Sequence, residues 1–161
     1  MEKQHKVQCY AAPLEGITGY IYRNAHQHIF QGVDKYFTPF VTPKPKKGIN
    51  TREKNDIAPE HNKNIPVVPQ ILTNKAADFI KVAGMMEELG YKEVNLNLGC
   101  PSGTVVSKKK GSGFLADLEG MKYFFDEVFS QVNIEVSVKT RLGVENPDEV
   151  IDLMNVYNAF P

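Results

Sequence analysis

The sequence predicts an α/β fold built on a parallel sheet. Strand-like and helix-like segments alternate along the 161 residues. The strand-like segments begin roughly thirty residues apart, as in consecutive βαβ units. A 42% apolar content suits one globular domain with a hydrophobic core. A doubly wound sheet and a (β/α) barrel both fit this alternation. Because a (β/α)8 barrel needs about 250 residues, the chain would supply only about its first five βα units.

The first two expected strands flank a helix. Residues 7–12 form a mostly apolar run that ends at Pro13, which cannot extend a strand ladder. Thr18 is suited to cap a helix, and we expect this helix to continue until Gly32 stops it. Residues 36–42 are expected to form the second strand.

A polar stretch separates the second strand from the third. Residues 43–64 are basic at first and poor in apolar residues, so we expect a long surface loop. Residues 65–72 are rich in β-branched side chains and predict the third strand. Asn74 is expected to cap a helix whose apolar residues recur at helical spacing up to Gly90.

The last elements have the clearest patterns. We expect the fourth strand at residues 93–98 and the fifth at residues 134–139. Between them, residues 119–132 carry one apolar stripe at helical spacing, which predicts an amphipathic helix. Asn146 and Pro147 predict one further helix, because Asn is a favoured cap and Pro is favoured at the first helical position.

Unusual residues end four of the expected strands. In parallel α/β folds these carboxyl ends converge on one mouth where ligands bind. Taken alone, Gln70 could simply satisfy loop backbone, and Lys139 could extend to the solvent rim rather than meet an anion or polar ligand. Together they predict one polar site. The segments concerned are residues 13–16, Gln70, residues 97–100 and residues 139–141.

Cys100 is the strongest single candidate for chemistry. It lies on an expected turn after a strand, where Gly99 allows a bend and Pro101 ends the ladder. A thiol presented there can exchange a proton or attack an electrophile. Cys9 lies inside an apolar run, and we expect it to fill the core. Two cysteines fit a reducing cytosol rather than a disulfide framework, so we expect a cytoplasmic protein.

A basic segment with glycines, residues 108–113, follows Cys100 closely. Such a loop can bind phosphate through backbone N–H groups and lysine charges, or it can be a solvated connection to the next helix. Its nearness to Cys100 favours a polyanionic substrate. Lysine plus arginine equals aspartate plus glutamate, 19 each, so bulk charge does not indicate a nucleic-acid partner.

Several classes of site and segment are not indicated. The four histidines have no metal-ligand spacing with the cysteines, so we expect no metal site. No run approaches the roughly 18 apolar residues of a membrane helix, and the polar N-terminus does not resemble a signal peptide. The histidines are His5, His26, His28 and His61.

Four motifs, in order, resemble those of the tRNA-dihydrouridine synthase family. They cover nearly the whole chain, and their combination is specific although each alone is not. The motifs are AAPLEGIT at residues 11–18, VPQIL at residues 68–72, NLNLGCP at residues 95–101 with the glycine-bearing segment 108–113 after it, and SVKTRLG at residues 137–143.

The resemblance implies an FMN-binding TIM barrel followed by a small helical RNA-binding domain. Residues 1–161 would be the N-terminal portion of this barrel, without its C-terminal half or the helical domain. The implied activity is the reduction of uridine to 5,6-dihydrouridine in tRNA, with NADPH reducing the flavin. The flavin would supply a hydride from N5, and Lys139 would stabilise its reduced, anionic form.

The resemblance also implies which residues contact which molecule. The flavin ring would meet Pro13, Leu14, Glu15, Gln70 and Lys139. The RNA or its uracil would meet Asn97, Lys108, Lys109 and Arg141. Cys100 would be the general acid, which requires a thiol that stays protonated.

Two alternatives remain at this point. One is another FMN-barrel oxidoreductase, such as a dihydroorotate dehydrogenase type, that acts on a free pyrimidine. The basic segment after Cys100 and the combined motifs argue against it. The other is an inactive, truncated half-barrel that binds flavin poorly, because an incomplete barrel exposes strand edges.

Overall fold

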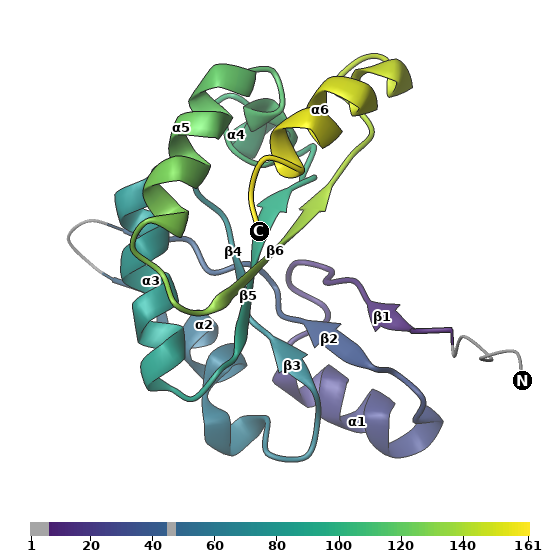
Figure 1. The fold of residues 1–161 in the computed structure, drawn as a ribbon. Helices are drawn as coiled ribbons and strands as arrows, with labels where there is room; N and C mark the ends of the chain where they lie inside the picture. Colours follow the sequence, from purple (N-terminus) through teal and green to yellow (C-terminus); the bar gives the residue numbers. More distant parts are fainter. Residues whose placement is uncertain (1–6, 45–47) are drawn as a thin grey trace, which may run out of the picture.

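The computed structural model describes residues 7–44 and 48–161, and it shows the α/β architecture that the sequence predicts (Figure 1). Every strand pairing among these residues is parallel, in two sheets of order β1-β2-β3 and β4-β5-β6. The strands are β1 Tyr10–Ala11, β2 Lys35–Phe37, β3 Val67–Val68, β4 Gln70–Ile71, β5 Glu93–Leu98 and β6 Glu135–Thr140. The helices are α1 Tyr20–Phe30, α2 Thr51–Ile57, α3 Ala76–Glu88, α4 Gly103–Val106, α5 Leu118–Phe129 and α6 Val150–Tyr157, with 3-10 turns at Pro59–His61, Gly111–Phe114 and Pro147–Glu149.

The two sheets are joined by one strand that changes partner at Pro69. β3 pairs with β2. β4 begins after the single intervening residue Pro69 and pairs with β5. The Pro69 carbonyl oxygen accepts a hydrogen bond from the Asn95 N–H at 2.8 Å. The predicted third strand, residues 65–72, is therefore a single path that links both sheets.

The two faces of β5 have opposite chemistry. Val94, Leu96 and Leu98 are fully buried in the hydrophobic core, and α3 and α5 lie together along this side of the β4-β5-β6 sheet (Figure 1). Because side chains alternate along a strand, the remaining β5 residues face the other way. These residues are polar and nearly as buried: Glu93, Asn95 and Asn97. The helices therefore cover an apolar face, and the polar face is left for the site.

Two of the predicted helices form for the expected reasons. In α5, Met121, Phe124 and Val128 are buried on one stripe, and the Asp117 side chain caps the helix by accepting a hydrogen bond from the Gly120 N–H. Before α6, the Asn146 side chain and Glu149 form a reciprocal capping box around the 3-10 turn.

The prediction of a surface loop over residues 43–64 is wrong, because α2 and a 3-10 turn lie within it. Residues 45–47 of that stretch lie outside the described part. Asn50 and Glu53 form a capping box that starts α2. This Asn-x-x-Glu pattern is present in the sequence, but the low apolar content of residues 43–64 favoured the prediction of a loop. α2 is short and is held by tertiary contacts rather than by an apolar stripe.

Buried Arg23 of α1 makes hydrogen bonds to the end of α2 and to Asn62 beyond it. Its guanidinium donates to the carbonyl oxygens of Thr18 and Asp56 and to Asn62 Oδ1, and it lies 3.8 Å from the Asp56 carboxylate. Burial lowers the pKa of Arg23, and the nearby Asp56 charge opposes this shift. A buried cation at this position therefore depends on α2 being folded.

Two predicted helix caps are wrong. The Thr18 hydroxyl is bonded to both the N–H and the carbonyl oxygen of Leu14, so it does not cap α1. Asp56 of α2 accepts from the Tyr20 N–H instead, at 2.7 Å. The Asn74 side chain donates to the Lys108 carbonyl oxygen, and α3 begins after Lys75 without a side-chain cap.

The prediction that Cys9 fills the core is also wrong, because Cys9 is exposed. It precedes β1, which lies at the edge of its sheet and pairs only with β2 among the described strands. An apolar sequence pattern cannot show which strand lies at an edge, and an edge strand lacks neighbours that would cover its side chains.

Candidate active site

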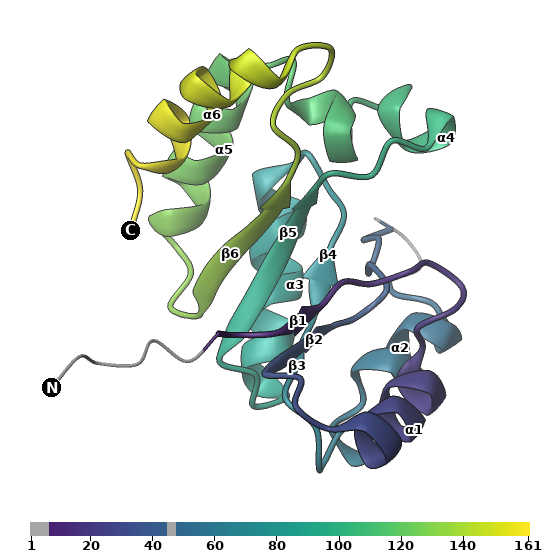
Figure 2. The ribbon, with the colours of Figure 1, turned by 90° about the vertical axis from the view of Figure 1, so that its right-hand side faces the viewer.

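The predicted strand ends meet in one cleft of about 230 Å³. Gly99 and Cys100 directly follow β5 and Arg141 directly follows β6, so the cleft lies at the carboxyl ends of these strands, whose arrowheads Figure 2 shows. Eight residues proposed from the sequence line it: Pro13, Leu14, Glu15, Gln70, Asn97, Cys100, Lys139 and Arg141. Of the other lining residues, Gly99 belongs to the predicted segment 97–100, whereas Pro39, Phe40 and Pro101 were not proposed.

Gln70 and Asn97 form the buried floor of this cleft. Gln70 is fully buried and Asn97 is 7% exposed. Asn97 Nδ2 donates to Gln70 Oε1 at 2.8 Å, and Gln70 Nε2 donates to Asn95 Oδ1 at 2.8 Å. The Gln70 amide is thus bonded to side chains of β5 and does not satisfy loop backbone, which was the alternative expectation.

The turn that presents Cys100 is held from three directions. Asn97 Oδ1 accepts from the N–H groups of Gly99 (3.2 Å) and Cys100 (3.0 Å). Arg141 Nε donates to the Gly99 carbonyl oxygen at 2.8 Å. Both the N–H and the hydroxyl of Ser112 donate to the Cys100 carbonyl oxygen at 3.0 Å. The N–H and carbonyl groups of Gly99 and Cys100 are thus all hydrogen-bonded. The Cys100 side chain lines the cleft and is partly exposed.

The basic segment after Cys100 divides into two parts. Gly111 and Ser112 are buried against the Cys100 turn, so this part is neither a solvated connection nor free to bind phosphate. Lys108 and Lys109 are exposed and do not line the cleft. Lys110 is partly buried, and this burial lowers its pKa.

The side chains that line the cleft rim are mostly cationic. Lys139 and Arg141 line it with exposed side chains. Glu15 is the acidic residue among the lining residues, and it forms an ion pair with Arg52 of α2. The exposed Lys139 side chain thus extends to the rim of the cleft, and its meeting with an anion or polar ligand stays a prediction.

A row of polar groups behind the cleft was not expected from the sequence. Asn95 donates to Ser137 Oγ at 2.9 Å, and Ser137 donates to Glu93 Oε1 at 2.7 Å. Lys35 pairs with the same carboxylate, and the hydrogen bond to Glu93 raises the pKa of Lys35. Polar residues at every second position of β5 were the signal, but their partners on other strands depend on register.

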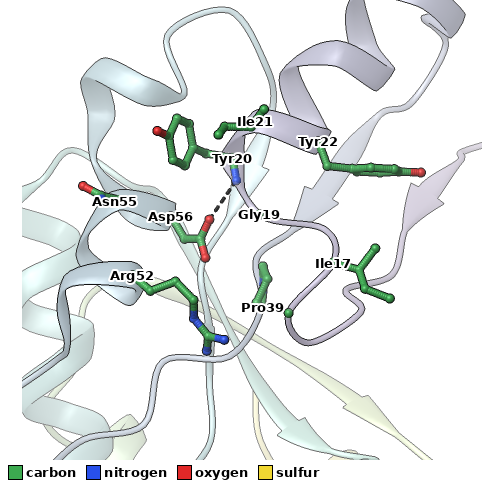
Figure 3. A pocket seen from close by; sticks show the side chains of 10 residues that line it. Ile17, Gly19, Tyr20, Ile21, Tyr22, Pro39, Arg52, Asn55 and Asp56 are labelled. Carbon is green, nitrogen blue, oxygen red and sulfur yellow. Dashed lines mark hydrogen bonds between the residues drawn. The ribbon is translucent and has the colours of Figure 1, made fainter.

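A second and larger cavity, of about 460 Å³, lies between the start of α1 and α2 (Figure 3). Two of its polar side chains are engaged: Asp56 accepts from the Tyr20 N–H, and Arg52 pairs with Glu15. Its other lining includes the exposed apolar side chains of Ile17 and Ile21. No cysteine of the described residues lines this cavity, whereas Cys100 lines the smaller cleft.

Two further searches covered the described residues. Within residues 7–44 and 48–161, no three His, Cys, Asp or Glu side chains lie together as they would around a metal ion. No helix in the same part of the chain is long and apolar enough to cross a membrane.

Comparison with known proteins gives matches over most of the chain. The sequence model of the family described as "Dihydrouridine synthase (Dus)" matches residues 10–160. Over 142 residues, 86% of this chain, the sequence is 29% identical to "Probable tRNA-dihydrouridine synthase 2" of Bacillus subtilis, of which the match covers 42%. Over 83 residues, 52% of this chain, it is 35% identical to "tRNA-dihydrouridine(20/20a) synthase" of Shewanella oneidensis, of which the match covers 25%. The chain thus spans less than half the length of these curated relatives.

Proposed function

The chain belongs to the dihydrouridine synthase family, and from this premise we propose that it serves the flavin-dependent reduction of uridine to 5,6-dihydrouridine in tRNA. The observation that carries the proposal is the meeting of Cys100, Gln70, Asn97 and Lys139 in one cleft at the strand ends. Relatives that match up to 86% of the chain are named tRNA-dihydrouridine synthases, which supports the same reaction.

We propose that the strands form an arc of a (β/α) barrel, with residues 1–161 as its N-terminal portion. Each strand lies beside its neighbour in chain order, and β3 continues into β4. A doubly wound sheet would instead place later strands on the far side of the first one. The family match over residues 10–160 supports the barrel reading.

The cleft fits the polar edge of a flavin ring. Asn97 carries an amide N–H beside the cleft, Lys139 adds a cation, and fully buried Gln70 holds Asn97 by a side-chain hydrogen bond. Carbonyl oxygens and unprotonated ring nitrogens are the acceptors such donors need. Gln70 and Lys139 would hold that edge, while Pro13, Leu14 and Glu15 would lie along the ring from the β1 side.

Cys100 is the proposed proton donor. Saturating the uridine C5=C6 bond requires a hydride at C6 and a proton at C5, and a bound reduced flavin supplies the hydride. The Cys100 thiol gives its proton to C5 from the opposite face of the base, so its turn must be held firmly while the base enters. Asn97 Oδ1, which accepts from the Cys100 N–H, and the donors Ser112 and Arg141 supply that hold.

The remaining partners are assigned from family membership and charge. We propose tRNA as substrate and NADPH as reductant, in the cytoplasm. The target base must leave its stack to reach Cys100, and cationic side chains outside the cleft would hold the RNA backbone. Lys108 and Lys109 are exposed after α4, and Arg141 lies at the rim.

The direct test supplies the purified protein with FMN, NADPH and unmodified tRNA, and measures dihydrouridine by mass spectrometry. Dihydrouridine that forms with the parent sequence and not with Cys100→Ala supports the proposal. Turnover of only a free pyrimidine would favour the dihydroorotate dehydrogenase type of enzyme instead. Absence of flavin absorbance and of all turnover would favour an inactive half-barrel.

A further inference from the structure

One row of hydrogen-bonded polar side chains follows β5 from the cleft to the opposite end of the sheet. Its members, in order from the cleft, are Asn97, Gln70, Asn95, Ser137, Glu93 and Lys35. Asn97, Asn95 and Glu93 share one face of β5 because strand side chains alternate. Gln70 of β4 and Ser137 of β6 are the register partners of Asn95, one on each side of it. Gln70 links Asn97 to Asn95, and Ser137 links Asn95 to Glu93.

From Asn97 to Glu93, each hydrogen bond that joins two members of the row is donated by the member nearer the cleft. Asn97 Nδ2 donates to Gln70 (2.8 Å), and Gln70 Nε2 donates to Asn95 (2.8 Å). Asn95 Nδ2 then donates to Ser137 (2.9 Å), and the Ser137 hydroxyl donates to Glu93 Oε1 (2.7 Å). The row therefore has a single direction from Asn97 to Glu93.

The two ends of the row fix this direction. At the cleft, the backbone N–H groups of Gly99 and Cys100 can only donate, and Asn97 Oδ1 accepts both. At the other end, an ionised Glu93 carboxylate can only accept, and Lys35 donates to its second oxygen. Reversing one amide between these ends would set two nitrogens or two oxygens against each other.

We propose that Glu93 is a positioning residue for Cys100, acting through Ser137, Asn95, Gln70 and Asn97. The carboxylate holds the row in the direction that leaves the Asn97 carbonyl oxygen for the Cys100 turn. Glu93 touches neither the cleft nor the Cys100 turn itself, and among the five groups it is the only acidic one.

The same direction determines what Asn97 offers a ligand. Its carbonyl oxygen already accepts two backbone N–H groups, so only the second hydrogen of Nδ2 remains for a molecule in the cleft. The ligand atom that meets Asn97 must then be an acceptor, such as a ring carbonyl oxygen or an unprotonated ring nitrogen. This last step rests on the proposed function, whereas the role of Glu93 does not.

The direction can be measured in the unaltered chain without any ligand. NMR couplings through hydrogen bonds should join Asn97 Nδ2 to the Gln70 side-chain carbonyl carbon, and Gln70 Nε2 to that of Asn95. A coupling from Gln70 Nε2 to the Asn97 side-chain carbonyl carbon would show the opposite direction and overturn the proposal. This measurement decides the matter even where a variant fails to fold.

Glu93→Gln tests the positioning role. The new amide can donate toward Ser137, so the row can reverse and turn Asn97 Nδ2 toward the Cys100 N–H. We expect hydrogen exchange of the Cys100 backbone N–H to accelerate about fivefold to tenfold, as for loss of one hydrogen bond. Exchange of the Leu96 N–H within the β5 ladder should stay unchanged, which separates this effect from general destabilisation.

Glu135→Gln is the matched control. Glu135 is the register partner of Glu93 on β6, but it is exposed and lies outside the row. It should leave Cys100 exchange unchanged. Equal Cys100 exchange in Glu93→Gln, Glu135→Gln and the parent chain would overturn the proposal. None of these measurements involves flavin or RNA, so this proposal and the proposed function can fail separately.

Discussion

Gly111 lies so close to Cys100 that a side chain on it would collide with the Cys100 backbone. A Cβ atom added at Gly111 would lie 2.7 Å from the Cys100 carbonyl oxygen and 3.0 Å from its Cβ. Gly111 also has a φ of +55°, which disfavours any residue with a Cβ. The glycine after the lysines therefore permits the close packing that supports the proposed acid.

Gly111→Ala should destabilise the fold and disturb the Cys100 turn. Left-handed strain and the short contact together should lower the free energy of unfolding by about 1–3 kcal/mol. Denaturant unfolding measures this value, and alkylation of Cys100 in a Cys9→Ser background reports the turn. Gly103→Ala is the control, since a Cβ there meets nothing within 4 Å. Equal stability of the two variants would contradict the packing argument.

Cys100→Ala should keep flavin and lose dihydrouridine formation. Removing a general acid typically slows a reaction about 10²–10⁴-fold. The thiol contributes no hydrogen bond to the turn, because the bonds at Cys100 involve its backbone N–H and carbonyl oxygen. Single-turnover assays of tRNA reduction, with flavin content measured alongside, give both quantities. Activity near that of the parent would rule out the acid role.

Lys139→Met should weaken flavin binding about tenfold or more, as expected for loss of one charged hydrogen bond. The substitution keeps an unbranched apolar stem at the cleft rim and removes only the charge. Fluorescence titration with FMN measures the affinity. Lys122→Met is the control, because Lys122 is paired with Glu119 on α5 and does not line the cleft. Equal affinity in both variants would refute the placement of Lys139.

Tyr91→Phe should destabilise the protein less as the pH rises from 10 to 12. The Tyr91 hydroxyl donates to the Ile57 carbonyl oxygen, and burial raises its pKa to about 12. The unfolded side chain titrates near pH 10, so the stability that its protonated form provides is complete below pH 10 and is lost as the pH approaches 12. The hydrogen bond to Glu93 also raises the pKa of Lys35, so the stability that protonated Lys35 contributes is likewise lost as the pH rises.

The difference between parent and variant isolates Tyr91 from Lys35. Below pH 10 the variant should lack about one hydrogen bond, roughly 0.5–1.5 kcal/mol. Denaturant unfolding at pH 8, 10 and 11 measures this difference in the free energy of unfolding. These pH values lie on both sides of the ordinary tyrosine pKa of about 10. A gap that stays constant across the series would contradict the assignment.

The sequence predicted best where a local pattern and the tertiary fold require the same thing. The strand at residues 93–98 forms over the predicted residues, and Asn146 caps the 3-10 turn that leads into the last helix. α2 escaped prediction because it depends on contacts between distant residues, such as Arg23 with Asp56. The exposure of Cys9 likewise depends on strand position, which local pattern does not contain.

The candidate site, like the fold, could be predicted from the sequence only in part. Convergence of the strand ends could be predicted, because parallel strands place their carboxyl ends at one edge. The hydrogen-bonded row behind it could not, because it joins Gln70, Asn95 and Ser137 from three strands and depends on their register. Sequence motifs thus located the cleft, whereas the structure showed how its polar groups are oriented.

We propose that the flavin ring enters this cleft beside Cys100. An NMR titration of the isotopically labelled chain with FMN tests this placement. We expect shifts concentrated on the side-chain amides of Gln70 and Asn97 and on the backbone of Cys100 and Lys139. Shifts that concentrate instead around Ile21 and Asn55 in the larger cavity, or no shifts at any FMN concentration, would contradict it.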